Sequence, residues 1–436
     1  MTQPRRRLTT LPLVAATYFM VAGGPYGLEE LLAKAGVWRA ALVIVVTPFV
    51  WSLPTSLMVA ELGAAIPEEG GYYAWVKRAL GPFWGFQEAW LSLAASVFDM
   101  AIYPTLFVTY LARLWPAVGA HPTLVGGAMI AACVGANLGG AKAAGRASEA
   151  LSVVLLAPFV LFVIYAFYKH SGATVAVAPP KDGDLLGALL VAMWNTMGWD
   201  NASTVADEVV RPQRTYPIAM LASVALVALT YAVPVVAVGV AGIDVRAWDT
   251  GAWVEAGGAV GGPWLATLVV VGGVACGVGM FNALLLSYSR IPAALADDGF
   301  LPKVFARRTR RTEAPWLSLV ACSVAWAAML GLSFDRLVTL DILLYGSALL
   351  LEFVALVVLR VREPDLARPF KAPGGLPGAI ALGVGPAVLL ALSLVAGERE
   401  DVGGVSALAI GAAVALGGVP LYFALRPRRD RAPASP

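Results

Sequence analysis

The chain has 436 residues, of which 59% are hydrophobic and only 14% are charged. Soluble proteins average about 45–50% apolar and about 25% charged residues, so the composition excludes a water-soluble fold of this length. The 31 basic and 28 acidic residues leave a net charge of +3, which gives no sign of nucleic-acid binding. Two histidines in predicted loops and three widely separated cysteines predict no metal site, no cofactor and no disulfide framework.

Twelve apolar runs are long enough to cross a bilayer, which takes roughly 20 residues in a helix. An even number of crossings places both termini on one side, and most lysines and arginines fall on that side. We therefore predict an all-α polytopic protein of the cell (plasma) membrane, with a basic cytoplasmic N-terminus at 1–8 and a basic cytoplasmic tail at 426–436. The runs are 9–35, 38–65, 81–113, 123–140, 147–169, 186–210, 215–242, 262–292, 315–333, 337–360, 377–396 and 404–425.

The basic start of the chain has a second interpretation. Arg5–Arg7 followed by an apolar run is also typical of a signal peptide. No small-residue cleavage site follows, and eleven further runs do, so we expect the first run to be a membrane span.

The first and sixth runs are interrupted near their middles. Gly23–Gly27 contains three glycines and a proline, and these cost a helix about 1 kcal/mol for each glycine and about 3 for the proline. Trp194–Ser203 combines polar side chains with a glycine at a comparable depth. Interrupted helices at corresponding positions of two halves indicate the substrate site of an inverted-repeat transporter. The alternative for either break is a kinked helix that packs closely through its small residues.

Two long motifs and four shorter ones stand out in the sequence. The long motifs are Ala60–Leu62 with Pro67–Tyr72 and Gly81–Phe86, and Gly198–Thr204 with Glu208–Val209 and Arg211–Pro217. They resemble the second-to-third helices, and the sixth helix with its following loop, of the amino acid–polyamine–organocation (APC) permeases. The other four are Gly23–Glu30, Asp99–Pro104, Leu344–Tyr345 with Leu351–Phe353, and Arg368–Lys371. Within that superfamily these four resemble the polyamine uptake transporters of plants and protozoa.

This resemblance implies a LeuT-like fold of two inverted five-helix repeats with two extra helices. The repeats would occupy 9–169 and 186–360, with broken helices 1 and 6, and helices 11 and 12 would occupy 377–425. The resemblance also implies secondary active uptake driven by a proton or cation gradient.

Acidic residues lie within the predicted spans without basic residues at the same depth. A carboxylate in a membrane pairs, takes up a proton or faces a wet cavity. A cationic substrate, or a proton in its absence, meets this need. The APC resemblance implies a place for a coupling lysine in the fifth helix of some amino acid carriers, but here the fifth span has lysine only at its end. Proton coupling must then use a carboxylate, and Glu88, Asp200 and Glu352 are the coupling candidates. The acids are Glu61, Glu88, Asp99, Glu149, Asp200, Asp341 and Glu352, with Glu29 and Glu30 beyond the first break.

The predicted substrate site combines the two breaks with one face of the third span. The spacing of Glu88, Ser92, Ser96, Asp99 and Tyr103 places them on one helical face, where a hydrogen-bonding stripe is the alternative. The full set of predicted substrate-binding residues is Gly23, Gly24, Tyr26, Gly27, Asp99, Tyr103, Trp194, Asn195, Trp199, Asp200 and Asn201.

Asp200 is the first candidate because it lies at the second break beside Trp199, whose ring can stack on an alkylammonium. The alternative for Asp200 is a cap on the second half-helix. Tyr26 is either an aromatic gate or core packing. For Asp341, Tyr345 and Glu352 we expect a structural or coupling role, because nothing in the sequence places them at the breaks.

We predict import of a small organic cation, such as putrescine or spermidine, by proton- or cation-coupled symport. The alternative is a proton-coupled amino acid permease of the same superfamily, whose members hold the substrate carboxylate on free N–H groups at the first break. Pro25 removes one of these N–H groups. A channel is a less favoured alternative, because it needs a continuous polar path through the membrane. A membrane hydrolase needs a catalytic base, and no histidine lies within the spans to supply one, so we expect no enzyme activity.

Overall fold

The computed structural model describes residues 8–139, 141–170, 183–331, 334–399, 401–402 and 404–427. Almost all of the basic N-terminus predicted at 1–8 and of the tail predicted at 426–436 lies outside the described residues. The elements in chain order are α1 (Thr10–Val21), α2 (Glu29–Ala35), α3 (Val37–Thr47), η1 (Pro48–Ser52), α4 (Leu53–Ala65), α5 (Tyr72–Leu80), α6 (Pro82–Leu114), η2 (Pro116–Ala120), α7 (Pro122–Asn137), α8 (Ala141–His170), α9 (Leu185–Trp194), η3 (Trp199–Glu208), α10 (Pro212–Val240), α11 (Trp253–Gly261), α12 (Pro263–Tyr288), α13 (Arg290–Asp297), α14 (Trp316–Ala327), α15 (Phe334–Arg362), α16 (Gly375–Arg399), the paired antiparallel strands β1 (Asp401–Val402) and β2 (Val405–Ser406), and α17 (Ala407–Leu425).

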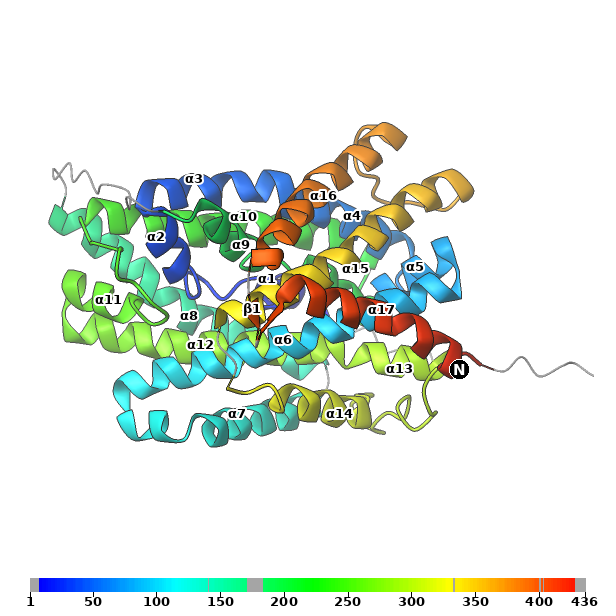
Figure 1. Cartoon of the computed structure of the whole chain (residues 1–436), viewed down its shortest axis with the longest axis horizontal. Coiled ribbons are helices and arrows are strands. Elements are labelled where there is room, and N and C mark those ends of the chain that lie inside the picture. Colours follow the sequence, from blue (N-terminus) through cyan, green and yellow to red (C-terminus); the bar gives the residue numbers. More distant parts are fainter. Residues whose placement is uncertain are drawn as a thin grey trace, which may run out of the picture.

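Long helices dominate the bundle (Figure 1). Within the described residues, eight helical segments are long and apolar enough to cross a membrane. The other four predicted runs, 9–35, 123–140, 186–210 and 315–333, contain the shorter helices α1, α7, α9 and α14. The chain is therefore an α-helical, multi-pass membrane protein.

Both interrupted runs break where glycine permits a left-handed backbone. The helix α1 ends at Val21, and helical structure resumes at Glu29 after Gly24 and Gly27, whose φ angles are 65° and 91°. In the second run, α9 ends at Trp194 and the 3-10 helix η3 begins after Gly198, which has a φ of 92°. Glycine adopts such angles without the steric cost that other residues have, so these positions fix where the helices stop.

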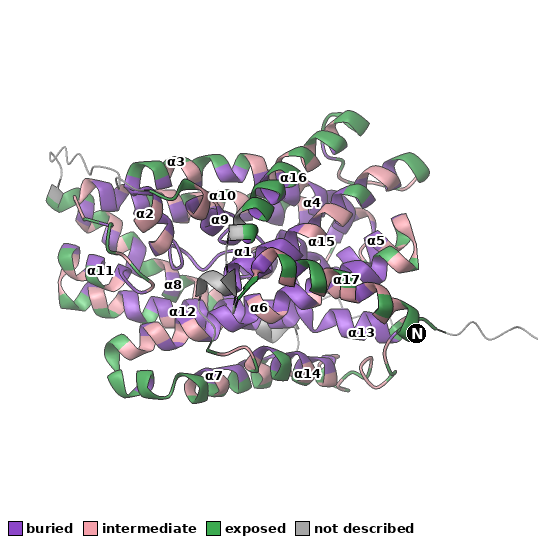
Figure 2. Ribbon diagram, viewed as in Figure 1, coloured by how far each residue is buried: buried purple, intermediate pink, exposed green. Residues whose placement is uncertain are grey.

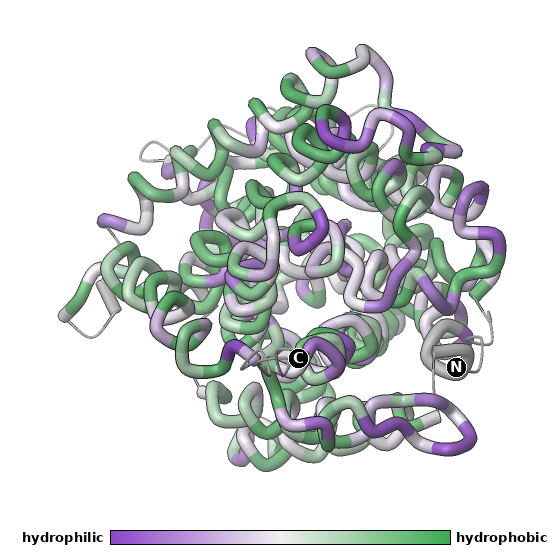
Figure 3. Tube along the Cα trace, turned by 90° about the vertical axis from the view of Figure 1, so that its right-hand side faces the viewer, coloured by the Kyte–Doolittle hydropathy of each residue, from purple (hydrophilic) through white to green (hydrophobic). Residues whose placement is uncertain are grey.

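The exterior of the bundle is apolar. Large hydrophobic side chains stand exposed on the outer helices, as Phe49, Leu124 and Val153 do at 68–74% exposure. Figure 2 shows buried residues along the central helices, including α6 and α12, and exposed residues on the outer ones. The end-on view in Figure 3 shows hydrophilic residues gathered in the connections between helices. An apolar flank with polar ends suits a bilayer.

The two ends of the bundle are named by a group of basic side chains at one of them. The helices α5 and α13 lie at one end, and α2 and α11 lie at the other (Figure 1). We name the first the basic end, because it holds the ion-paired side chains of Lys77, Arg78, Arg290, Arg308 and Arg360. We name the opposite one the far end.

Candidate functional site

A small cavity lies where the two broken helices meet α6, α12 and α15. Its volume is about 10 Å³, which is close to the minimum that holds one water molecule. An organic cation therefore does not fit without movement of the surrounding helices. The lining residues are Met20, Val21, Asp99, Tyr103, Trp194, Met197, Gly198, Asn201, Leu284, Tyr288, Asp341 and Tyr345.

Two carboxylates from different helices line this central cavity. Asp99 comes from α6 and Asp341 from α15, and both are almost fully buried. The Tyr103 hydroxyl donates to Asp99 Oδ1 at 2.5 Å, and the Tyr103 ring stacks on the Trp194 ring with a centroid distance of 6.4 Å. No lysine or arginine is among the lining residues. Carboxylates beside aromatic faces form a setting that favours an alkylammonium group.

Tyr345 connects α15 to the second break. Its hydroxyl accepts a hydrogen bond from the Gly198 N–H at 2.9 Å and donates one to the Asp200 carboxylate. Tyr345, for which a structural or coupling role is expected, thus lies at the second break, and Asp341 lines the same cavity as Gly198. The sequence missed these contacts because they depend on how α15 packs on α9 and η3.

Some predicted site residues join the two breaks instead of lining the cavity. The Asn195 side-chain amide donates to the Gly27 carbonyl at 3.1 Å. Tyr26 donates to the Val269 carbonyl at 2.6 Å and packs edge-on against Tyr110, so of its two expected roles the contacts match core packing. Four of the predicted site residues line the cavity, namely Asp99, Tyr103, Trp194 and Asn201. The lining does not include the other seven, which are Gly23, Gly24, Tyr26, Gly27, Asn195, Trp199 and Asp200.

Trp199 and Asp200 differ in their surroundings. The Trp199 ring is fully buried, and its Nε1–H donates to the Thr196 carbonyl at 2.8 Å within the break itself. Asp200 stands in the first turn of η3, where its carboxylate meets the Tyr345 hydroxyl. Asp200 therefore does not line the central cavity itself but contacts Tyr345, which does.

Glu61 has basic partners, contrary to the expectation for the acids within the spans. Arg360 Nε donates to Glu61 Oε1 at 2.9 Å, and Arg368 lies 3.3 Å from the same oxygen. The Ala372 N–H donates to Glu61 Oε2 at 2.8 Å. These partners come from the end of α15 and the connection after it, some 300 residues along the chain, so sequence proximity gave no sign of them.

The structure is closed at the far end. Glu29 accepts hydrogen bonds from the Gly27 N–H at 2.7 Å, from the Gly251 N–H at 3.1 Å and from the Tyr110 hydroxyl. The Trp253 indole donates to the Pro25 carbonyl at 2.8 Å. The first break is thereby tied to α11 and its preceding loop.

The basic end is closed as well. The Tyr72 N–H donates to Ser203 Oγ at 3.1 Å, and the Gly70 N–H donates to the Thr204 carbonyl at 3.3 Å, so the start of α5 lies on η3. Arg290 pairs with Glu208 at the end of η3. On the surface, the Arg78 guanidinium holds the pKa of Glu363 below its usual value by hydrogen bonding. Together with the far-end contacts, these interactions enclose the central cavity.

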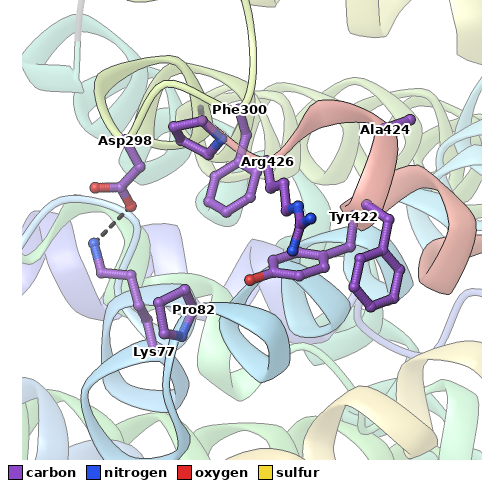
Figure 4. A pocket seen from close by; sticks show the side chains of 9 residues that line it. Lys77, Pro82, Asp298, Phe300, Tyr422, Ala424 and Arg426 are labelled. Atoms are coloured by element: carbon purple, nitrogen blue, oxygen red, sulfur yellow. Dashed lines mark hydrogen bonds and ion pairs between the residues drawn. The ribbon is translucent and has the colours of Figure 1, made fainter. Parts of the chain in front are cut away.

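A larger cavity opens at the basic end (Figure 4). Its volume is about 1120 Å³, and it shares no lining residue with the central cavity. Lys77 Nζ lies 2.6 Å from Asp298 Oδ2 on its wall, and the Arg426 guanidinium lies 5.3 Å from the centre of the Phe423 ring. The lining residues are Lys77, Pro82, Asp298, Phe300, Tyr422, Phe423, Ala424, Arg426 and Pro427.

Comparison with known proteins identifies the family. The family model described as amino acid permease matches residues 14–416. The chain belongs to the amino acid permease family. The predicted resemblance to APC permeases is confirmed, and the chain is a membrane transporter and not an enzyme.

The curated relatives extend the likeness over most of the chain. The polyamine transporter RMV1 of Arabidopsis thaliana is 34% identical over 390 residues, which are 88% of this chain and 79% of that protein. The polyamine transporter PUT1 of Oryza sativa subsp. japonica is 36% identical over 428 residues, covering 97% of this chain and 78% of that protein.

A solved structure shares the fold. The crystal structure of MhsT in complex with L-phenylalanine aligns with a TM-score of 0.66 at 14% identity, covering 90% of this chain and 99% of MhsT. At this identity the likeness establishes the fold alone.

Proposed function

We propose that this transporter imports a small organic cation, such as putrescine or spermidine, by symport with a proton or another cation. The observation that carries the proposal is the lining of the central cavity, where Asp99 and Asp341 stand among aromatic rings with no basic side chain. A substrate with ammonium groups would neutralise both carboxylates. The names of RMV1 and PUT1 support the same substrate class.

In this proposal the cavity side chains of Asp99, Tyr103, Trp194 and Asn201 contact the substrate. Asp200 takes part through Tyr345, which holds it against the cavity wall. The two breaks act as hinges that let the half-helices move during alternating access. The residues that shape these breaks are Gly23, Gly24, Tyr26, Gly27, Asn195 and Trp199.

We further propose twelve spans, arranged as two inverted repeats of five helices followed by α16 and α17, in the plasma membrane. The basic end would then face the cytoplasm together with both termini, because lysine and arginine collect on that side of membrane proteins. Four short helices, α1, α7, α9 and α14, complete the twelve runs in this arrangement.

A proton-coupled amino acid permease is the second candidate. Its support is the description of the matching family model as amino acid permease. The composition of the cavity opposes it, because a substrate carboxylate would meet Asp99 and Asp341 without a basic partner among the lining residues.

Uptake by the purified protein in liposomes tests the proposal. Under an inward proton gradient, we expect accumulation of putrescine or spermidine in preference to leucine and arginine. Asp99→Asn should abolish this uptake, because it removes one of the two cavity charges. Asp244→Asn is the matched control, since Asp244 is exposed and pairs only with the neighbouring Arg246 among the described residues. Preferential uptake of leucine, or unchanged uptake by Asp99→Asn, would contradict the proposal.

A further inference from the structure

A second carboxylate pair lies in register with the first. The helices α6 and α15 run antiparallel, since Asp99 and Asp341 line one cavity while Arg362, at the end of α15, donates to the Ala79 carbonyl just before α6 begins. Moving 11 residues from Asp99 (99 − 88) and 11 from Asp341 (352 − 341) leads to Glu88 and Glu352. Eleven residues are close to three helical turns and about 16 Å, so the second pair lies on the same faces, nearer the basic end.

This second pair is buried and largely without hydrogen bonds. Glu88 and Glu352 are 0% and 1% exposed. The Ser92 hydroxyl donates to Glu88 Oε1 at 3.2 Å. Within the described residues, Glu88 Oε2, both carboxylate oxygens of Glu352 and the neighbouring Tyr72 hydroxyl have no partner. Two ionised carboxylates in such a place would each lack the hydrogen bonds and the counter-charge that burial requires.

The basic side chains around this pair are engaged elsewhere. On α5, Lys77 pairs with Asp298, as Figure 4 shows, and Arg78 pairs with Glu363. The next basic residue along α15 is Arg360, eight positions further, and it pairs with Glu61.

The remaining neighbours bring no positive charge either. Asp200 of η3 interacts electrostatically with both Glu88 and Glu352. Both glutamates in turn act on the Tyr72 hydroxyl of α5, and Glu352 also acts on the Tyr345 hydroxyl of α15. The sequences of α16 and α17 carry charge only at Glu398 and Arg399, at the end of α16. A positive charge for this pair therefore has to arrive from solution.

We propose that Glu88 and Glu352 form a proton-binding pair and that the proton they take up is the coupling proton of transport. The inference rests on the proposed function only in treating the chain as a proton-coupled carrier. One carboxylate becomes a carboxylic acid when a proton arrives from the far side, and it returns to a carboxylate when the proton leaves at the basic end. A proton needs no cavity, whereas an organic cation needs the ring-lined space beside Asp99.

Contacts near the pair connect it to the moving part of the site. Tyr345 lies seven residues, or about 10 Å, from Glu352 on α15, and it holds both Gly198 and Asp200. The Tyr72 N–H is bonded to Ser203 of the same η3 segment. Opening of the basic end must separate α5 from η3, which would admit water to Glu88 and Glu352 and let the proton leave.

The test separates coupling from substrate handling. Glu88→Gln, Glu352→Gln and the conservative variants Glu88→Asp and Glu352→Asp are reconstituted in liposomes with the membrane potential clamped at zero. Exposed Asp244→Asn serves as the control. If one proton moves with each substrate, a gradient of one pH unit supports about tenfold accumulation. Three readouts are taken: accumulation, counterflow without a pH gradient, and substrate-induced proton entry measured with an internal pH dye.

We expect both glutamine variants to lose accumulation and proton entry while counterflow stays near the wild-type rate, and the aspartate variants to regain part of the coupling. Accumulation that persists in both glutamine variants would overturn the proposal. So would equal loss of accumulation and counterflow in variants that elute as folded protein. The experiment uses whichever substrate the wild type transports, so transport of leucine instead of polyamines would refute the proposed substrate and leave this test intact.

Discussion

The hydroxyl of Tyr345 offers the sharpest test of how the second break is held. In Tyr345→Phe one atom is lost, and with it the hydrogen bond from the Gly198 N–H at 2.9 Å and the bond to the Asp200 carboxylate. A bond between neutral groups contributes about 0.5–1.5 kcal/mol and one to a carboxylate about 1.5–3, so the closed arrangement should lose about 2–4.5 kcal/mol. Both former partners would remain buried without replacement.

The assay compares the thermal midpoint of the purified variant with that of the wild type. Because the closed arrangement loses both hydrogen bonds, and about 1.4 kcal/mol corresponds to tenfold in an equilibrium constant, we expect the midpoint to fall clearly. The control is Tyr288→Phe, which removes the same atom from another cavity-lining tyrosine whose hydroxyl makes no hydrogen bond to the described residues. Equal behaviour of the two variants would refute the assigned role of Tyr345.

Two further predictions concern the closed structure. Arg360→Gln should lower the thermal midpoint, because it removes the buried ion pair with Glu61 and leaves Arg368, 3.3 Å away, as the remaining basic partner of Glu61; a midpoint equal to that of the wild type would contradict the pairing. Gly198→Ala should destabilise the protein and abolish transport, since its Cβ would lie 2.3 Å from the Met20 carbonyl oxygen at a φ of 92°. Gly127→Ala is the control, because its Cβ would have nothing within 4 Å. We expect it to keep the thermal midpoint and uptake rate of the wild type, and a clear change in either would contradict the steric argument for Gly198.

The sequence predicted features that depend on local chemistry. Glycine and proline disfavour a helix most where they cluster, so the break at Gly23–Gly27 could be located without a structure, as could the one around Gly198, where a glycine stands among polar side chains. Single prolines such as Pro104 and Pro234 lie inside continuous helices. The polar face of the third span could be predicted in the same way, because the spacing of Glu88, Ser92 and Asp99 alone puts these side chains on one face of α6.

Features that depend on packing between distant segments could not be predicted in the same way. The partner of Glu61 is Arg360, and the partner of Asp200 is Tyr345, and neither pair shares a motif or a spacing. The polar residues of α15, Asp341, Tyr345 and Glu352, follow a helical spacing that could be seen in the sequence. The sequence of a regular helix does not show which other helices it packs against. For this reason nothing in the sequence placed Tyr345 at the second break.

The two carboxylate pairs on α6 and α15 suggest how one helix interface can handle two different cations. The pair of Asp99 and Asp341 borders a cavity with aromatic walls, which suits a bulky ammonium, whereas Glu88 and Glu352 are at most 1% exposed, which suits a proton. Since both pairs span the same two antiparallel helices, any shift of α6 against α15 changes both charge separations at once. Neutralising one pair then alters the cost of moving the other, which is the energetic linkage that symport requires.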